Sequence, residues 1–174
     1  MKLAQVACVA GAMLLGACTT VEEQAMDSQV SDLTPCEKLQ ALITGHGKGF
    51  PVLRTTKSTT RYMDIWRARY HLVGDSCQVW GWGEDKFSYV CTLTEPNKDV
   101  AMEHFNLAKE RASTCLGTGW KVEEGPRKEG EGVRARFTKQ GSSTAVSVLA
   151  VASPTLFKTE WRTYYFVGDP SDAL

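Results

Sequence analysis

A stretch that occurs twice is the feature that most constrains how this chain of 174 residues can fold. Residues 67–71 read Arg-Ala-Arg-Tyr-His, and residues 134–138 read Arg-Ala-Arg-Phe-Thr. The correspondence continues without a gap to Val79 and Val146. A Gly-x-Gly-aromatic-x-Val pattern also occurs twice, at 47–52 and at 117–122. Because self-similarity at a fixed spacing marks a repeated structural unit, we expect an internal duplication.

The same order of secondary structure is predicted in each half of the chain. Thr34 and Glu37 have the spacing of a capping box, which predicts a helix from residue 35. An apolar stripe at helical spacing predicts a second helix that opens near residue 96. Alternating apolar and polar residues predict about four strands after each helix. We therefore predict an α+β fold, an internally duplicated helix plus about four antiparallel strands, with two α-β-β-β-β halves at 35–95 and 96–174.

The size of each predicted half bears on how the two halves pack. A unit of about 60–70 residues buries too little surface to be stable alone. We therefore expect the halves to form one compact domain. They would form either one continuous curved sheet with both helices on one face or two sheets that face each other. This arrangement is similar in architecture to secreted β-lactamase-inhibitor proteins and to small outer-membrane assembly lipoproteins, without a shared motif.

The first residues have the pattern of an export signal. Lys2 precedes a mostly apolar run at 3–15, which is too short to anchor the chain across a bilayer. The run ends in Leu-Gly-Ala-Cys at 15–18, which resembles the lipobox of bacterial lipoproteins. The resemblance implies that residues 1–17 are a signal peptide and that Cys18 becomes an acylated first residue. The alternative is an ordinary secretory signal with an incidental cysteine.

The residues that follow Cys18 indicate a destination and a linker. Thr19 comes next, whereas lipoproteins kept in the inner membrane typically have Asp there. The resemblance therefore implies a lipid anchor in the bacterial outer membrane, on the periplasmic side. Residues 19–34 are polar and acidic with no clear period, so we expect 18–34 to form a lipidated, flexible tether.

Four cysteines remain beyond the predicted signal peptide, namely Cys36, Cys77, Cys91 and Cys115. In an exported domain this number favours two disulfides. Cys77 and Cys91 are equidistant from Glu84, so a symmetric hairpin places them opposite each other. Cys36 and Cys115 lie on the buried faces of the two predicted helices. We prefer the pairs Cys77–Cys91 and Cys36–Cys115, and the alternative is Cys36–Cys77 with Cys91–Cys115.

Two tryptophans at a predicted hairpin are the first candidate binding residues. Trp80 and Trp82 share one face of a strand, opposite Cys77 and Val79. If no helix covers that face, two large aromatic anchors on a rigid ribbon mark an interaction site. The alternative is that both side chains pack beneath a helix or the other half.

The repeated arginines are the second candidate set. Arg67, Arg69, Arg134 and Arg136 fall on the polar faces of two strands that the repeat makes equivalent. They could present a basic stripe to an acidic partner, lipid head groups or phosphate. The alternative is a solvated outer face that nearby glutamates balance.

Catalytic and metal-binding motifs are absent from the sequence. It contains no G-x-S-x-G, no H-E-x-x-H and no S-x-x-K with supporting motifs. His46, His71 and His104 have no partner at metal-ligand spacing. The formal net charge of zero argues against non-specific nucleic-acid binding.

These observations favour a binding protein over an enzyme. We predict a protein without catalytic residues, metal or cofactor, anchored by lipid and facing the periplasm. It would hold or inhibit another cell-envelope protein. The alternative is a carrier or sensor of a hydrophobic small molecule or lipid, held between the helices and the sheet.

Overall fold

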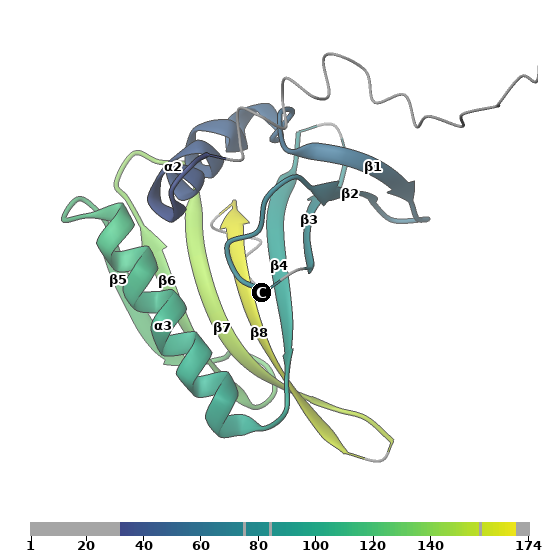
Figure 1. Ribbon diagram of the computed structural model, residues 1–174, viewed down its shortest axis with the longest axis vertical. Coiled ribbons are helices and arrows are strands. Elements are labelled where there is room, and N and C mark those ends of the chain that lie inside the picture. Colours follow the sequence, from purple (N-terminus) through teal and green to yellow (C-terminus); the bar gives the residue numbers. More distant parts are fainter. Residues whose placement is uncertain (1–31, 75, 84, 157, 170–174) are drawn as a thin grey trace, which may run out of the picture.

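The computed structural model describes residues 32–74, 76–83, 85–156 and 158–169. The predicted signal peptide, Cys18 and most of the predicted tether lie outside these residues. The described chain forms one curved antiparallel sheet with two α-helices packed against it (Figure 1). In chain order the elements are α2 (Pro35–Gly45), the 3₁₀ helix η1 (His46–Lys48), β1 (Arg54–Thr59), β2 (Asp64–Ala68), β3 (Ser76–Gly81), β4 (Phe87–Glu95), α3 (Lys98–Leu116), β5 (Lys121–Pro126), β6 (Gly132–Thr138), β7 (Ala145–Pro154) and β8 (Thr159–Gly168).

The sheet is continuous, in the order β1-β2-β3-β4-β8-β7-β6-β5. β4 and β8 pair in register from Tyr89 with Val167 to Glu95 with Trp161. The predicted fold class, two duplicated α-β-β-β-β halves packed together, is therefore wrong: the structure is one eight-stranded antiparallel sheet with two helices. The chain does not divide into two packed halves, because a ladder of backbone hydrogen bonds joins β4 to β8.

The first strands are also shorter than the sequence pattern predicts. Alternation over 62–73 predicts one long strand, but β2 ends at Ala68. The N–H of Arg69 then donates to the carbonyl of Leu53 at 3.0 Å, and the chain leaves the sheet. The polar residues Arg54–Thr59 form the edge strand β1. The apolar side chain of Tyr70, beyond Ala68, is buried without belonging to a strand: it is only 5% exposed.

Local side-chain chemistry fixes where both helices begin. The Thr34 N–H and hydroxyl donate to Glu37 Oε2 at 2.8 and 2.7 Å, and the Glu37 N–H donates to Thr34 Oγ1 at 3.3 Å. This is the predicted capping box, which satisfies donors that the first turn leaves free. Asn97 caps α3 in the same sense, because its Oδ1 accepts from the Val100 N–H at 3.0 Å. Within the described residues, no helix is long and apolar enough to cross a membrane.

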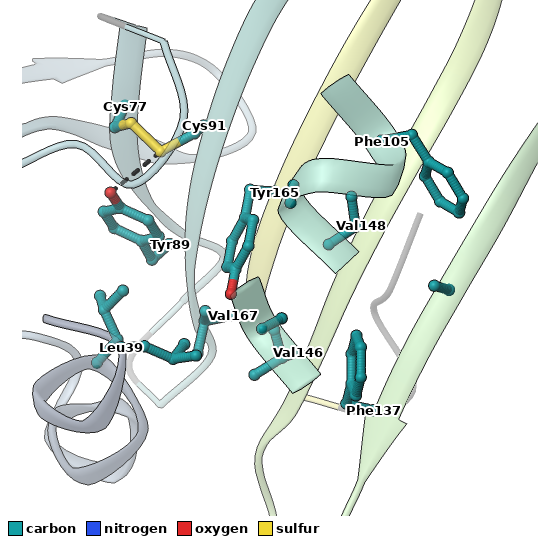
Figure 2. Packing of buried hydrophobic residues seen from close by; sticks show 14 of the residues in the cluster. Leu39, Cys77, Tyr89, Cys91, Phe105, Phe137, Val146, Val148, Tyr165 and Val167 are labelled. Carbon is teal, nitrogen blue, oxygen red and sulfur yellow. Dashed lines mark hydrogen bonds between the residues drawn. A yellow bond between two sulfur atoms is a disulfide. The ribbon is translucent and has the colours of Figure 1, made fainter. Parts of the chain in front are cut away.

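The main core lies between the helices and the sheet (Figure 2). α3 packs on β7, β8 and β4, whereas α2 packs on α3 and β8. The buried stripe of α3 consists of Ala101, Phe105, Ala108, Ala112 and Leu116. Its small residues let the helix approach the sheet closely, and Phe105 is fully buried among the strands. Each such large apolar side chain contributes about 1.5–3 kcal/mol on burial.

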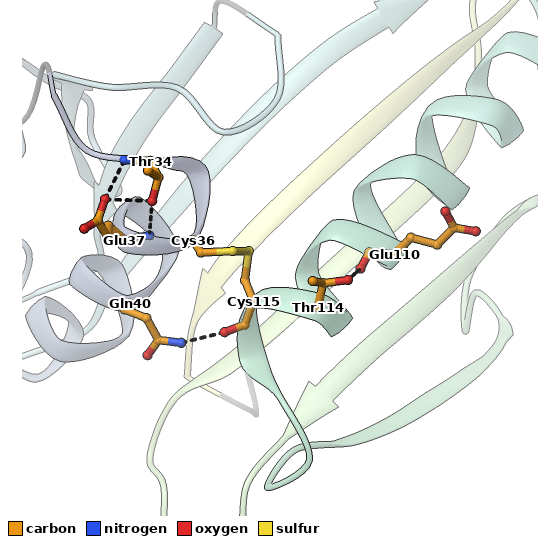
Figure 3. The surroundings of a disulfide bond; sticks show 7 residues. All are labelled: Thr34, Cys36, Glu37, Gln40, Glu110, Thr114 and Cys115. Carbon is orange, nitrogen blue, oxygen red and sulfur yellow. Dashed lines mark hydrogen bonds between the residues drawn. A yellow bond between two sulfur atoms is a disulfide. The ribbon is translucent and has the colours of Figure 1, made fainter.

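Two disulfides lie within the described residues, one between the two helices and one within the β3–β4 hairpin. Cys36 is bonded to Cys115, and Cys77 to Cys91, with Cα–Cα distances of 4.8 and 4.0 Å. The preferred pairing is therefore confirmed, and the alternative pairing is wrong. The first bond joins the start of α2 to the end of α3 (Figure 3), where Gln40 Nε2 also donates to the Cys115 carbonyl at 2.9 Å.

Candidate functional site

Strand register decides which predicted binding residues share a face of the sheet. Val79, Ala135 and Phe137 belong to the core beneath the helices. Their neighbours in sequence therefore point to the opposite side, which we call the helix-free face. Trp80, Arg67, Arg134 and Arg136 all lie on it, in strands β3, β2, β6 and β6.

The two predicted tryptophans form one aromatic pair at the end of β3. Their ring centroids are 5.8 Å apart, with an edge-to-face angle of 85° between Trp80 and Trp82. Trp80 Nε1 donates to Gln78 Oε1 at 2.8 Å, and the Trp82 N–H donates to the Lys86 carbonyl at 2.9 Å. Both side chains are half-buried. The pair is therefore rigid and retains part of its surface for contact.

The predicted arginines do not form one stripe. Arg67 pairs with Gln78, and the row continues through Val90, Phe166 and Ser147 to Arg136. Five inter-strand intervals separate β2 from β6 in the sheet order. At about 4.8 Å each, they place Arg67 roughly 24 Å from Arg136.

Arg69 lies apart from the other three arginines. It follows the end of β2, and its Nε donates to the Val52 carbonyl at 3.0 Å. The structure thus brings Arg134 and Arg136 close together at one end of the helix-free face. Arg67 lies near the tryptophans at the other end. The sequence repeat aligns Arg67 and Arg69 with Arg134 and Arg136, but the two pairs occupy different places in the continuous sheet.

The middle of the helix-free face is buried and mostly apolar, with Ser88 and Ser147 as its buried polar residues. Its buried residues fall outside the main core and include Val90, Phe166 and Leu149, all at 1% exposure or less. Leu149 lies opposite Arg134 in the β6–β7 ladder and opposite Tyr164 in the β7–β8 ladder. The sheet is therefore closely packed on both sides, although the described helices lie on only one.

A cleft of about 330 Å³ opens on the helix side, between α2, α3 and the chain at 71–74. Leu39, Ala112 and Tyr165 form its base and are almost fully buried. Leu72, Leu93 and Leu107 also line it, and Leu107 is 44% exposed. The cleft thus has an apolar wall from its buried base to its opening.

Basic side chains surround this apolar cleft. Lys38, His71, His104 and Arg111 line it, from α2, the chain after β2 and α3. None of the described lining residues is Asp or Glu. His71 and Arg111 are exposed, and Lys38 and His104 are half-buried. The cleft therefore offers positive charge at the opening and apolar surface beneath it.

A tyrosine hydroxyl at the base of the cleft lacks a partner in the described part of the chain. Tyr165 is 4% exposed, and no hydrogen bond to its hydroxyl is formed there. The hydroxyls of Tyr70 and Tyr89 differ, because each donates to a backbone carbonyl, of Lys38 at 2.8 Å and of Tyr70 at 3.0 Å. Burial raises the pKa of Tyr165, so it remains a neutral hydrogen-bond donor.

A buried carboxylate holds one side of the cleft in place. Glu95 Oε1 accepts a hydrogen bond from Thr163 Oγ1 at 2.8 Å and lies 2.8 Å from His104 Nδ1. The Glu95 side chain is only 1% exposed. These contacts fix the orientation of the His104 ring at the cleft.

Sequence reasoning missed the residues of the cleft. Lys38, His71, Arg111 and Tyr165 come from three elements and one connecting segment, and no motif links them. The only signal was the general expectation of a space between helices and sheet. Among the described residues, no group of three or more His, Cys, Asp or Glu side chains is placed to hold a metal ion.

Comparison with known proteins adds no assignment to this geometry. A scan against protein-family models, a search of curated proteins and a search of solved structures each found no match for the chain. The two surfaces and their chemistry are therefore the basis for a functional hypothesis.

Proposed function

We propose that this chain is a lipid-anchored binding protein of the bacterial outer membrane, without catalytic activity. Anchored through Cys18, it faces the periplasm and holds or inhibits another cell-envelope protein. The observation that supports this proposal is the Trp80–Trp82 pair, which is half-buried and rigid on the helix-free face. Rigid aromatic side chains that lose little freedom on binding are favoured anchors at protein interfaces.

The surroundings of the pair suit a protein partner. Arg67 is exposed on the neighbouring strand and pairs in register with Gln78, which holds Trp80. An aromatic anchor beside an arginine is the combination that interface hot spots favour. Arg134 and Arg136 extend the same face at its far end.

A site-specific crosslink tests this proposal in living cells. A photo-crosslinking amino acid replaces Trp82 in the full-length chain, and Leu156 in a control. Leu156 is 94% exposed in the turn between β7 and β8. That turn lies at the end of the strands where Trp161 pairs with Glu95, whereas the tryptophans lie at the end where Gly81 pairs with Phe87. We expect a discrete crosslinked protein from position 82 and none from position 156.

A second variant connects the crosslink to the aromatic pair. Trp80→Ala in the position-82 background removes the remaining tryptophan of the pair, and circular dichroism checks that the fold persists. The crosslinked product should fall at least about tenfold, as expected when a hot-spot residue is truncated. An equal yield from positions 156 and 82, or no product from either, contradicts the proposal.

The cleft favours a second candidate function. It lies between the helices and the sheet, where a carrier or sensor would hold a hydrophobic small molecule or lipid. Its volume of about 330 Å³ is at the lower end of the range of small-molecule sites, ~300–1,000 Å³. Bound lipid in native mass spectra of the purified full chain would support this function, and its consistent absence would oppose it.

A further inference from the structure

We infer that the cleft between α2, α3 and residues 71–74 binds an anionic amphiphile with one alkyl chain, of the fatty-acid class. This inference rests on the second candidate function, carriage of a hydrophobic ligand, and adds the chemistry of that ligand. The cleft combines an apolar wall, the basic side chains of Lys38 and Arg111, and the hydroxyl of Tyr165.

The apolar wall of the cleft favours a ligand with an alkyl chain. Leu39, Leu72, Leu93 and Leu107 line it with Ala108 and Ala112. Leu107 is 44% exposed at the opening, although the residues beneath it are buried. Covering such a side chain with an alkyl chain is favourable by about 25 cal/mol per Å² of apolar surface removed from water. A purely polar ligand would gain none of this energy.

The charges at the opening select the head group. Lys38, His71, His104 and Arg111 lie around the cleft without an acidic residue among the described lining positions. Glu95 lies 2.8 Å from His104 and offsets charge there, so Lys38 and Arg111 supply the positive charge at the opening. Positive charge beside apolar surface attracts an anion and repels an ammonium group. The guanidinium of Arg111 matches the two oxygens of a carboxylate, which form parallel hydrogen bonds with it.

The Tyr165 hydroxyl gives the cleft a polar group at its base. In the described part of the chain it forms no hydrogen bond, although the side chain is 4% exposed. The hydroxyl is not among the described buried side-chain atoms that lack a partner, so water reaches it in the free protein, and a polar group of the ligand can replace that water. Figure 2 shows Tyr165 on β8 and Leu39 on α2, which are both in the cleft wall.

The volume of the cleft favours a ligand with one chain. About 330 Å³ is small for a molecule with two long acyl chains and a head group, and the wall comes from only two helices and one side of the sheet. A single-chain carboxylate satisfies both the apolar wall and the basic opening. We therefore choose dodecanoate as the probe.

The test is a titration of the full-length chain with dodecanoate that carries ¹³C in its carboxyl group. The protein is held in digitonin, whose rigid steroid nucleus is unlike an alkyl chain. The bound carboxyl resonance reports affinity and environment together. Dodecanol, which has the same chain without the charge, is titrated by competition against the labelled probe.

Three variants isolate the contribution of the cleft. Arg111→Gln removes the exposed cation without changing a buried residue, and Arg61→Gln removes an exposed arginine of the β1–β2 turn as a control. We expect Arg111→Gln to weaken dodecanoate binding about tenfold and to leave dodecanol unchanged, since one charge-assisted contact is lost. Tyr165→Phe should weaken binding about threefold or more. Arg61→Gln should bind as the wild type does.

The possible results distinguish a failure of this inference from a failure of the carrier function on which it rests. Preference for dodecanoate that Arg111→Gln removes supports the inference. Equal binding of dodecanoate and dodecanol, unaffected by Arg111→Gln, overturns the anionic class and leaves the carrier function in place. Binding of neither probe overturns both, and a loss shared by Arg61→Gln overturns the assignment to the cleft.

Discussion

Cys36 in the first turn of α2 is bonded to Cys115 in the last turn of α3, across 79 residues of sequence (Figure 3). This bond holds the two helices together at the end of the cleft, because Pro35 and Cys115 both line it. The other bond, Cys77–Cys91, lies within one hairpin and closes only 14 residues.

The two disulfides should therefore stabilise the fold unequally. In the chain-entropy model, closing the longer loop contributes about 4–5 kcal/mol and closing the shorter about 3 kcal/mol. We expect the double change Cys36→Ala/Cys115→Ala to lower the free energy of unfolding more than Cys77→Ala/Cys91→Ala. Guanidinium titration of both variants measures the difference, and the reverse order would contradict the loop argument.

The cleft tyrosine and a core tyrosine make a matched pair of hydroxyl deletions. Tyr89→Phe should cost about 1–3 kcal/mol, because the Tyr89 hydroxyl donates to the Tyr70 carbonyl and accepts from the Leu72 N–H at 3.2 Å. Tyr165→Phe removes a hydroxyl that is unpaired in the described residues, so the ligand-free protein should keep its stability within about 0.5 kcal/mol. Thermal unfolding of both variants tests this contrast. Equal losses would mean that Tyr165 has a partner in the free protein.

Thr163 and Thr59 offer a second matched comparison. Each donates a hydrogen bond to a carboxylate, Thr163 to the buried Glu95 at 2.8 Å and Thr59 to the more exposed Asp64 at 2.7 Å. We expect Thr163→Val to cost about 1–3 kcal/mol, since a buried charge loses a donor. Thr59→Val should change the free energy of unfolding by less than about 0.5 kcal/mol, because water replaces the lost bond. Urea titration measures both, and similar costs would show that burial of Glu95 is unimportant.

Alkaline solution should destabilise the protein through its buried tyrosines. Burial raises the pKa of Tyr70, Tyr89 and Tyr165, whereas a tyrosine in the unfolded chain loses its proton near pH 10. Above that pH the unfolded state binds fewer protons than the folded state, so the free energy of unfolding falls as pH rises. Ultraviolet absorbance of tyrosinate should show these three groups ionising together with unfolding. Their ionisation near pH 10 in the folded protein would contradict the prediction.

Acid should weaken the contact between β1 and β2 at the edge of the sheet. Hydrogen bonds from Lys57 and Thr59 lower the pKa of Asp64, which joins β1 to β2. A lowered pKa means that the contact is formed above the unfolded-state value and is lost as pH falls through the folded value. Carbon NMR of the Asp64 carboxyl should therefore give a midpoint below that of an exposed Asp. In Lys57→Gln the midpoint should rise, and an unchanged value would contradict the assignment.

The features that sequence predicted well depend on nearby residues. The capping box of Thr34 and Glu37 needs only three residues of spacing, and it forms as expected. The hairpin of β3 and β4 places Cys77 opposite Cys91 because its turn lies midway between them. The heptad-like stripe of α3 likewise fixed its buried face. Each of these follows from backbone geometry over fewer than about 20 residues.

The sequence by itself therefore determined the helix starts and the faces of several strands, and it favoured one disulfide pairing that the structure then confirmed. Only the tertiary structure decided that β4 pairs with β8, and this pairing replaced two halves by one sheet. Alternation shows which side chains share a face, but it does not name the neighbouring strand, since any extended edge offers the same hydrogen-bonding groups. For the same reason Arg67 and Arg134, which the repeat makes equivalent, lie at opposite ends of the helix-free face. The cleft with Arg111 and Tyr165 exists only because that pairing brings α2, α3 and β8 together.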